Sequence, residues 1–344
     1  MSELTRNQLV NRRDFLRRAG DSARVAGLGA ALAALHRPAS AAAAATNPWA
    51  YDDSAFRRTD PKLVRYQEVK RFRCPHAAPR CLALSPDNRL FIGAGKYLTE
   101  HTVDGAQLSE ITLAAEPRCL AVAADGLLYV GLRDHLEVCD RKGLRLGSWP
   151  SPGAKTYFTG IAAAESDLFL ADAGNRVVLR FDRSGKLKGR IGEKNKARNI
   201  PGFIIPSPFF DVRLAPDGLL RVTNPGRHCV ETYTSDGNLE SAWGKPGAGI
   251  ERFCGCCNPI NLALLPDNRI VTFEKGIPRV KVYSADGSFE SVVAGTESFA
   301  ENARVCGPND CTLGGLAGVA DAQGRIYILD FVAANVRVMQ PNEA

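Results

Sequence analysis

Histidine and long apolar runs are scarce in this chain of 344 residues. It contains five His, and so few imidazoles argue against a zinc enzyme whose metal is held mainly by histidine. Beyond residue 46, no segment approaches the roughly 20 consecutive apolar residues that a membrane-spanning helix needs. The sequence also has no Gly-rich phosphate-binding loop and no Ser-His-Asp constellation. We therefore predict no membrane span in the main part of the chain, and no nucleotide-binding or serine-hydrolase site.

The excess positive charge lies mostly at the N-terminus. The chain has a formal net charge of +7, and residues 1–46 contain seven Arg but only three acidic residues. The rest of the chain is close to neutral and has no basic stripe. This distribution argues against nucleic-acid binding.

The first 45 residues carry the features of a twin-arginine export signal in the expected order. Arg12-Arg13 precedes Phe15-Leu16, a moderately apolar stretch spans 25–35, and 39–42 reads Ala-Ser-Ala-Ala, a small-residue cleavage pattern. The apolar stretch is too short to cross a bilayer. We predict a cleaved signal over 1–45, a linker over 46–61 and a periplasmic protein. The alternative is a basic amphipathic helix at the start of a cytoplasmic protein.

One sequence unit recurs six times beyond residue 62. Each copy has a short apolar strand, a tight turn, a second apolar strand that ends in a polar residue, and two further strands. The first strands of the copies start at Cys81, Cys119, Gly160, Asp211, Asn261 and Ala317. The spacing of 38 to 56 residues suits a four-stranded propeller blade.

Six such copies predict an all-β fold, a six-bladed β-propeller. Asp-Gly and Asp-Asn pairs at the turns supply the positive φ angles that tight hairpins need. The last copy lacks a fourth strand, and the segment 64–72 before the first copy resembles that missing strand. We predict that it closes the ring and removes an open sheet edge. The propeller is expected over 62–340, with a tail over 341–344.

Two segments carry a resemblance to a known family. Residues 171–178 read Ala-Asp-Ala-Gly-Asn-Arg-Val-Val and closely resemble the signature of NHL repeats. The run Cys-Gly-Cys-Cys-Asn-Pro at 254–259 is similar to a subgroup of exported bacterial NHL-repeat proteins. The resemblance covers about residues 62–340. It implies a propeller whose blade linkers form the binding face, but such propellers include binding modules, lactonases and lyases.

All ten Cys lie beyond residue 46, and on this alignment nine fall on or near that face. Disulfides are the default in an exported protein, and the candidate pairs are Cys306 with Cys311 and Cys81 with Cys119. A second interpretation is a metal or redox centre, because thiolate and imidazole ligands suit copper, zinc or iron. Its candidate residues are Cys254, Cys256, Cys257, His228, Cys229, Cys81 and Cys119. A third interpretation is a redox-active thiol pair at Cys256 and Cys257.

Polar residues recur where the second strand ends in four copies: Asp172, Asn224, Glu274 and Asp330. Their oxygens could hold calcium in the channel, and the family resemblance implies that propeller lactonases and lyases use metal ions there. The alternative is structural, since short polar side chains bond nearby backbone amides and shape the following turn. Glu274 departs from the short side chains of that pattern and therefore draws more attention than the other three.

Together these features predict an exported binding or scaffold protein whose Cys-rich face engages a protein partner or a metal or redox centre. The alternative is a metal-dependent enzyme of the lactonase type with its site in the channel. The apolar linker 203–210 is expected to pack between blades, although exposed it would offer a docking patch.

Overall fold

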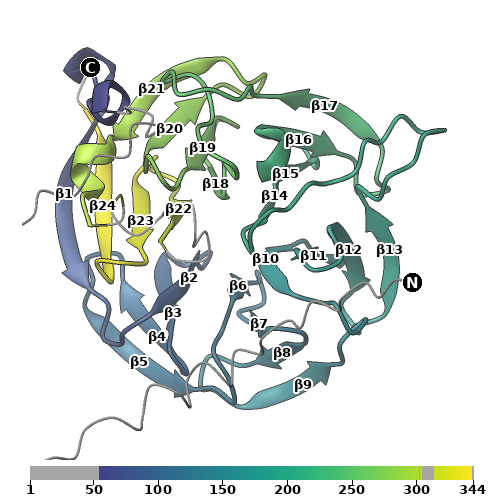
Figure 1. Ribbon diagram of the computed structural model, residues 1–344. Coiled ribbons are helices and arrows are strands. Elements are labelled where there is room, and N and C mark those ends of the chain that lie inside the picture. Colours follow the sequence, from purple (N-terminus) through teal and green to yellow (C-terminus); the bar gives the residue numbers. More distant parts are fainter. Residues whose placement is uncertain (1–53, 302, 304–313, 343–344) are drawn as a thin grey trace, which may run out of the picture. The chain divides into compact units, whose positions relative to one another are not determined.

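The short apolar runs form antiparallel sheets. The computed structural model describes residues 54–301, 303 and 314–342, which contain six four-stranded sheets arranged as the blades of a ring (Figure 1). The predicted all-β, six-bladed propeller is confirmed. In the described part of the chain, no helix has the length and apolar character needed to cross a membrane.

The four strands of each blade follow one another from the centre of the ring to its outside. Blade 1 contains β2 (Pro79–Leu84), β3 (Arg89–Ala94), β4 (Tyr97–Thr102) and β5 (Gln107–Thr112). Blade 2 contains β6 (Cys119–Val122), β7 (Leu128–Gly131), β8 (Leu136–Cys139) and β9 (Arg145–Trp149). Blade 3 contains β10 (Phe158–Ala163), β11 (Asp167–Asp172), β12 (Val177–Asp182) and β13 (Leu187–Ile191).

The second half of the ring repeats this order. Blade 4 contains β14 (Val212–Leu214), β15 (Leu220–Asn224), β16 (Cys229–Tyr233) and β17 (Leu239–Trp243). Blade 5 contains β18 (Asn261–Leu264), β19 (Ile270–Phe273), β20 (Val280–Tyr283) and β21 (Phe289–Ala294). Blade 6 contains β22 (Leu316–Ala320), β23 (Ile326–Asp330), β24 (Asn335–Pro341) and β1 (Tyr66–Arg73). The described short 3₁₀ helices are η1 (Ser54–Arg57), η2 (Pro61–Leu63), η3 (Pro225–Arg227) and η4 (Thr296–Phe299).

The hairpin turns have the backbone geometry that their residues favour. Asn88 and Asn268 have φ angles of 57° and 68°, and Gly126 and Gly218 have φ angles of 84° and 79°. Asn and Gly tolerate this left-handed conformation better than other residues do. The Asp-Asn and Asp-Gly pairs therefore fix the first hairpin of their blades, as predicted.

Burial falls from the inner to the outer strands of a blade. Every residue of β7, β15, β19 and β23 is buried, whereas β5, β9 and β13 alternate mostly exposed residues with single buried ones. Apolar side chains from adjacent blades pack together, for example those of blades 2 and 3 around Phe158 and Trp149. The innermost strands contact one another around the ring, and β22 contacts β2. This contact brings the first residues of all six blades to one channel (Figure 1).

Strand β1 closes the ring in the way the sequence predicts. It pairs antiparallel with β24 from Tyr66 opposite Pro341 to Arg73 opposite Asn335, with one bulge between Glu68 and Lys70. Arg337 Nη1 lies 2.9 Å from Glu68 Oε2 across this pair. The N-terminal strand thus takes the place that a fourth strand at the end of the chain would occupy.

Candidate functional site

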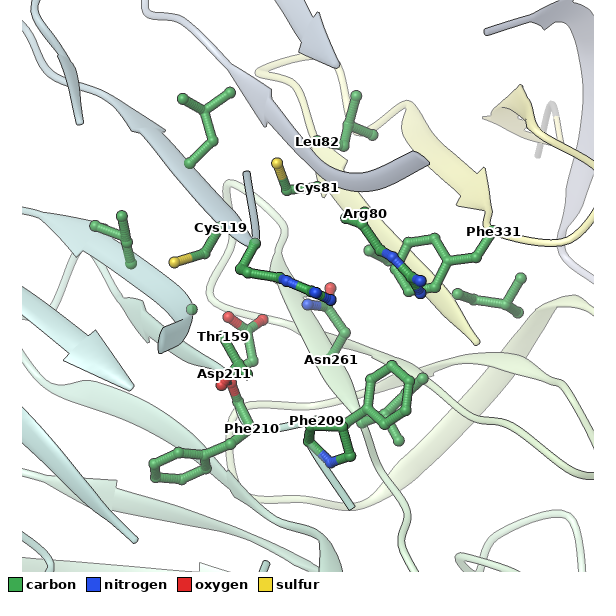
Figure 2. Close-up of a pocket in the computed structure, with 18 of the residues that line it drawn as sticks. Arg80, Cys81, Leu82, Cys119, Thr159, Phe209, Phe210, Asp211, Asn261 and Phe331 are labelled. Atoms are coloured by element: carbon green, nitrogen blue, oxygen red, sulfur yellow. Dashed lines mark hydrogen bonds between the residues drawn. The ribbon is translucent and has the colours of Figure 1, made fainter. Parts of the chain in front are cut away.

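A cavity of about 440 Å³ opens where the first strands begin (Figure 2). All six positions that the repeat alignment places at the start of a first strand line it: Cys81, Cys119, Gly160, Asp211, Asn261 and Ala317. The repeat register read from the sequence is therefore correct at the channel. We call this cavity the mouth pocket. A second cavity of about 320 Å³ lies further along the same strands, and Arg213 lines both.

Two arginines form a polar wall of the mouth pocket, and one carboxylate beside it pairs with both. Arg80 Nε lies 3.1 Å from Glu116 Oε1, and Arg118 Nη2 lies 2.9 Å from Glu116 Oε2. The Arg118 guanidinium also lies 5.5 Å from the ring centroid of Tyr157, at a distance where cation–π attraction operates. Both arginine side chains keep a quarter or more of their surface exposed. Two cationic groups that line the cavity therefore share a single carboxylate.

Asp211 adds a buried carboxylate to the same pocket. Its side chain is 1% exposed, and Oδ2 accepts a hydrogen bond of 3.0 Å from the Leu262 N–H and lies 3.1 Å from Arg213 Nη2. Oδ1 has no hydrogen-bond partner among the described residues. Burial raises the pKa of this carboxyl above its usual value, although the Arg213 charge opposes the shift. A buried carboxylate oxygen without a hydrogen bond costs free energy. The contacts of Oδ2 with Arg213 of blade 4 and Leu262 of blade 5 hold this carboxylate in place.

Gly160 leaves room for Asp211. A Cβ atom at position 160 would lie 2.6 Å from Asp211 Oδ1 and 3.0 Å from the Asp211 Cα. Any other residue would push the carboxylate or the backbone of blade 4 aside. The glycine in the third repeat is thus required by the aspartate in the fourth.

The mouth pocket also has an apolar lining. It includes Pro208, Phe209, Ile260, Leu316 and Phe331. The Phe209 ring also contacts Lys275, whose Nζ lies 4.4 Å from the ring centroid. The linker expected to pack between blades does so in large part, because Phe203, Ile205 and Phe210 are buried, while Ile204 is 47% exposed. Guanidinium groups, aromatic rings and branched side chains therefore all line one cavity.

Cys81 and Cys119 do not form the disulfide that their matching positions predict, and both are free thiols. Each sulfur instead fills the space over the glycine opposite on the next strand: a Cβ would lie 2.5 Å from the Cys81 sulfur at Gly93 and 2.3 Å from the Cys119 sulfur at Gly131. Figure 2 shows the two sulfur atoms pointing in different directions. Burial raises the pKa of Cys81 to about 12 and the pKa of Cys119 well above its usual value. The two thiols are therefore packing groups in the wall of the pocket.

The remaining candidates of the cysteine centre lie along blades 4 and 5. The sulfur atoms of Cys256 and Cys257 are 3.3 Å apart, and the Cys254 N–H donates to Glu274. Cys229 lies on β16, where its sulfur donates to Glu231 at 3.8 Å, and burial raises its pKa to about 12.

Among the described residues, no group of three or more His, Cys, Asp or Glu side chains could hold a metal ion. The seven predicted ligands, from Cys81 to Cys257 and including His228, are thus not brought together as one ligand set in the described part. The predicted pair Cys306 and Cys311 and the predicted signal over 1–45 lie outside the described residues.

Two of the four polar residues at the strand ends shape turns. Asp172 Oδ1 accepts hydrogen bonds from the N–H groups of Tyr157 and Asn175, at 3.0 and 3.1 Å. Asp330 Oδ1 accepts from the N–H groups of Val332 and Ala333, both at 3.0 Å. These contacts match the structural interpretation of the pattern, in which the aspartate bonds nearby backbone amides.

The other two members of that set stabilise loops. Asn224 accepts a hydrogen bond from the Ile204 N–H at 2.9 Å and donates to Glu231 at 2.8 Å. Glu274 is fully buried between Arg279 and Lys281, each 2.8 Å away. None of Asp172, Asn224, Glu274 and Asp330 lines either channel cavity. Their oxygens are committed to protein contacts and do not fit a calcium site in the channel.

The fold and the mouth pocket define the class of this protein: a six-bladed β-propeller with a cavity of mixed polar and apolar lining where its first strands begin. Its structure is similar to selenomethionine-substituted virginiamycin B lyase from Staphylococcus aureus, with a TM-score of 0.54, 12% identity, and coverage of 80% of this chain and 99% of that chain. A streptogramin B lyase gives a TM-score of 0.52, 12% identity, and coverage of 80% and 97%.

A third similar structure is a catalytically inactive variant of the Staphylococcus aureus lyase with quinupristin. Its TM-score is 0.53 at 14% identity, and the match covers 77% of this chain and 81% of that chain. No family model and no curated protein matches the sequence. At these identities the likeness is one of fold.

The sequence contained an unused signal for the polar wall. The pentapeptide Pro-Arg-Cys-Leu-Ala occurs at 79–83 and again at 117–121. In both copies the arginine directly precedes the residue at the start of the first strand, which brings Arg80 and Arg118 to the channel mouth. The cysteines drew attention to these positions, whereas the arginines beside them carry the exposed charge.

Proposed function

We propose that this protein binds a small molecule in the mouth pocket. The volume of about 440 Å³ lies within the roughly 300–1,000 Å³ that ligand pockets usually have. Polar groups from blades 1 to 5 converge on it, together with apolar side chains. Such a combination of apolar surface and a few placed polar groups is typical of ligand sites.

The observation that carries this proposal is the state of Asp211. A carboxylate that is 1% exposed, with one oxygen unsatisfied, lies in the wall of the cavity. Burial raises its pKa, and perturbed titratable groups at cavities concentrate at functional sites. Asp211 Oδ2 links blade 4 to blade 5 through the Leu262 N–H, whereas Oδ1 has no hydrogen-bond partner among the described residues and supports a role in binding a polar ligand.

The proposed setting is the periplasm. The twin-arginine pattern in residues 1–45 supports export, and the NHL-like segment 171–178 supports an NHL-repeat propeller. The similar structures are named as lyases. In the enzymatic version of this proposal, the protein would convert the molecule that it binds in the mouth pocket.

A second candidate function is the engagement of a protein partner through the Cys-rich loop before β18. It is favoured by Cys256, which is exposed and whose sulfur lies 3.3 Å from that of the buried Cys257. The metal-dependent enzyme of the lactonase type, with calcium in the channel, has less support, because the polar ring residues are committed to turn and loop contacts. The copper, zinc or iron centre at the Cys cluster has less support because the described residues contain no group of three or more suitable ligands.

Filling the pocket tests the proposed function. Ala317 lines the mouth pocket, so Ala317→Phe places a ring in it. We expect ligand-observed NMR with a mixed set of neutral and charged fragments to detect binders to the parent protein and to lose them in Ala317→Phe. The matched control is Ala106→Phe at an exposed turn, with circular dichroism to confirm the fold of both variants. The absence of binders, or binding that Ala317→Phe leaves intact, would contradict the proposal.

A further inference from the structure

We propose that the ligand of the mouth pocket is an organic acid with one negative charge and an apolar body, its carboxylate held by Arg80 and Arg118. This inference rests on the proposed function and adds the chemical class of the ligand. It follows from the charges of the polar wall, the contacts that each charge already has, and the apolar side chains that share the cavity with them.

The charges in and beside the pocket leave an excess of positive charge. Arg80, Arg118 and Arg213 line the cavity, while the nearby carboxylates belong to Asp211 and Glu116. Among the lining residues and their ion-pair partners, three guanidinium groups thus face two carboxylates, and Lys275 and Arg133 add positive charge behind the Phe209 and Tyr157 rings. A ligand with a single negative charge completes the balance, whereas a dianion would be repelled by the two carboxylates already present.

The three arginines differ in how many partners their guanidinium groups already have. Arg213 donates through Nε to the Leu262 carbonyl at 2.9 Å and pairs with Asp211 at 3.1 Å, so it belongs to the wall. Arg80 and Arg118 share Glu116, and Arg118 Nε has no hydrogen-bond partner among the described residues. Because this nitrogen is buried, the excess charge that a ligand can reach lies on the exposed parts of the Arg80 and Arg118 side chains.

The shape of these donors favours a carboxylate. A guanidinium presents N–H groups in a planar fork that matches the two oxygens of a carboxylate. The stacking of Arg118 on Tyr157 limits the orientations of its plane and reduces the entropy lost on binding. The pair is thus arranged to hold a planar anion, and a Lys ammonium at either position would not reproduce this geometry.

The apolar part of the lining determines the rest of the ligand. Phe209, Ile260, Leu316 and Phe331 present rings and branched chains with no charge. An acid with only a short polar body would leave this surface in contact with water. Each Å² of apolar surface buried contributes about 25 cal/mol, so an aromatic or branched body adds affinity that a small acid lacks.

Matched probes test this assignment. Hydrocinnamate has an acid and a ring, hydrocinnamamide is its neutral counterpart, and propionate lacks the ring. We expect titration calorimetry or NMR to show that hydrocinnamate binds at least about tenfold more tightly than either of the other two, because charge-assisted hydrogen bonds and ring burial act together. Added salt should weaken hydrocinnamate binding and leave the amide unchanged.

Variants assign the contact to its residues. Arg118→Gln should weaken hydrocinnamate binding about tenfold, and Arg118→Lys should restore only part of it. Phe209→Ala should weaken hydrocinnamate and leave the weak binding of propionate unchanged. The control is Arg71→Gln on β1, an arginine whose side chain is 50% exposed on the outer strand of blade 6.

The outcomes separate this inference from the proposed function. Equal binding of the acid and the amide, or no effect of Arg118→Gln in a folded protein, would overturn the organic-acid assignment. In that case, fragment binding that is lost in Ala317→Phe would still support the pocket as the binding site. No binding of hydrocinnamate at millimolar concentration would also overturn the assignment. Acid binding that persists in Ala317→Phe would place the site elsewhere and overturn both.

Discussion

Glu274 shows how a charged residue can be essential without belonging to the ligand site. It is fully buried with Arg279 and Lys281, and these two cations donate to carbonyl groups of the loop before β18, Arg279 to Ala248 and Lys281 to Ile250. Burial lowers the pKa of Lys281 to about 8, although the Glu274 charge opposes the shift. The three charges therefore stabilise the loop only as a set.

Removing the central anion should destabilise the protein. We expect Glu274→Gln to lower the free energy of unfolding by about 3–5 kcal/mol, because it leaves two buried cations without a counter-charge. Urea denaturation measures the change. The control is Glu251→Gln on the same loop, where a carboxylate that is 52% exposed pairs with Arg252 and should contribute less than about 1 kcal/mol. Equal midpoints for both variants would contradict this account.

For single residues, the sequence predicted the position in the fold better than the contacts of the side chain. The repeat placed Cys81 and Cys119 on the channel and singled out Glu274 from the other polar strand ends. It did not predict that the two sulfur atoms point away from each other, because side-chain direction depends on the local pairing with Gly93 and Gly131. Nor did it predict that Arg80 and Arg118 share Glu116, since that contact depends on how blades 1 and 2 pack.

Strand β1 is the element on which closure depends. Tyr66, at its start, is 6% exposed and packs with residues of blades 5 and 6, including Val293 and Met339. The Arg65 N–H donates to the Val292 carbonyl at 3.1 Å, so the segment also contacts the outer strand of blade 5. The closing strand therefore links the last two blades as well as covering the edge of β24.

Truncating this contact should loosen the ring. Tyr66→Ala removes a buried aromatic side chain, and we expect it to lower the free energy of unfolding by about 3 kcal/mol. Val69→Ala on the same strand is the control, because Val69 is 47% exposed and its change should stay within about 0.5 kcal/mol. Thermal or urea unfolding gives the comparison. A loss for Val69→Ala as large as that for Tyr66→Ala would count against a closing role for the buried residue.

Element boundaries were predicted closely for a physical reason. The segment expected to close the ring, 64–72, corresponds to Tyr66–Arg73, and the turns fall at the Asp-Gly and Asp-Asn pairs. Period-two apolar patterns and turn residues are local signals that the sequence carries directly. The linkers between blades carry no such period, so the side of the mouth pocket formed by Pro208, Phe209 and Ile260 appeared only in the structure.

Over the whole molecule, the repeats build a symmetric ring and the exceptions to the repeat build the site. The six equivalent positions at the channel hold five residue types, with Cys at both 81 and 119. The charged groups of the lining come from blades 1, 2 and 4, as Arg80, Arg118, Asp211 and Arg213, whereas apolar groups come from all around the ring. A strictly symmetric ring would repeat the same residue six times, whereas this one concentrates its charges on part of the ring.

The most direct test of this account is a crystal structure of the protein with hydrocinnamate. We predict density for the ligand in the mouth pocket, with its carboxylate oxygens about 3 Å from the guanidinium groups of Arg80 and Arg118 and its ring against Phe209 and Phe331. A ligand bound at the loop of Cys254, Cys256 and Cys257 with the mouth pocket filled only by water would contradict it.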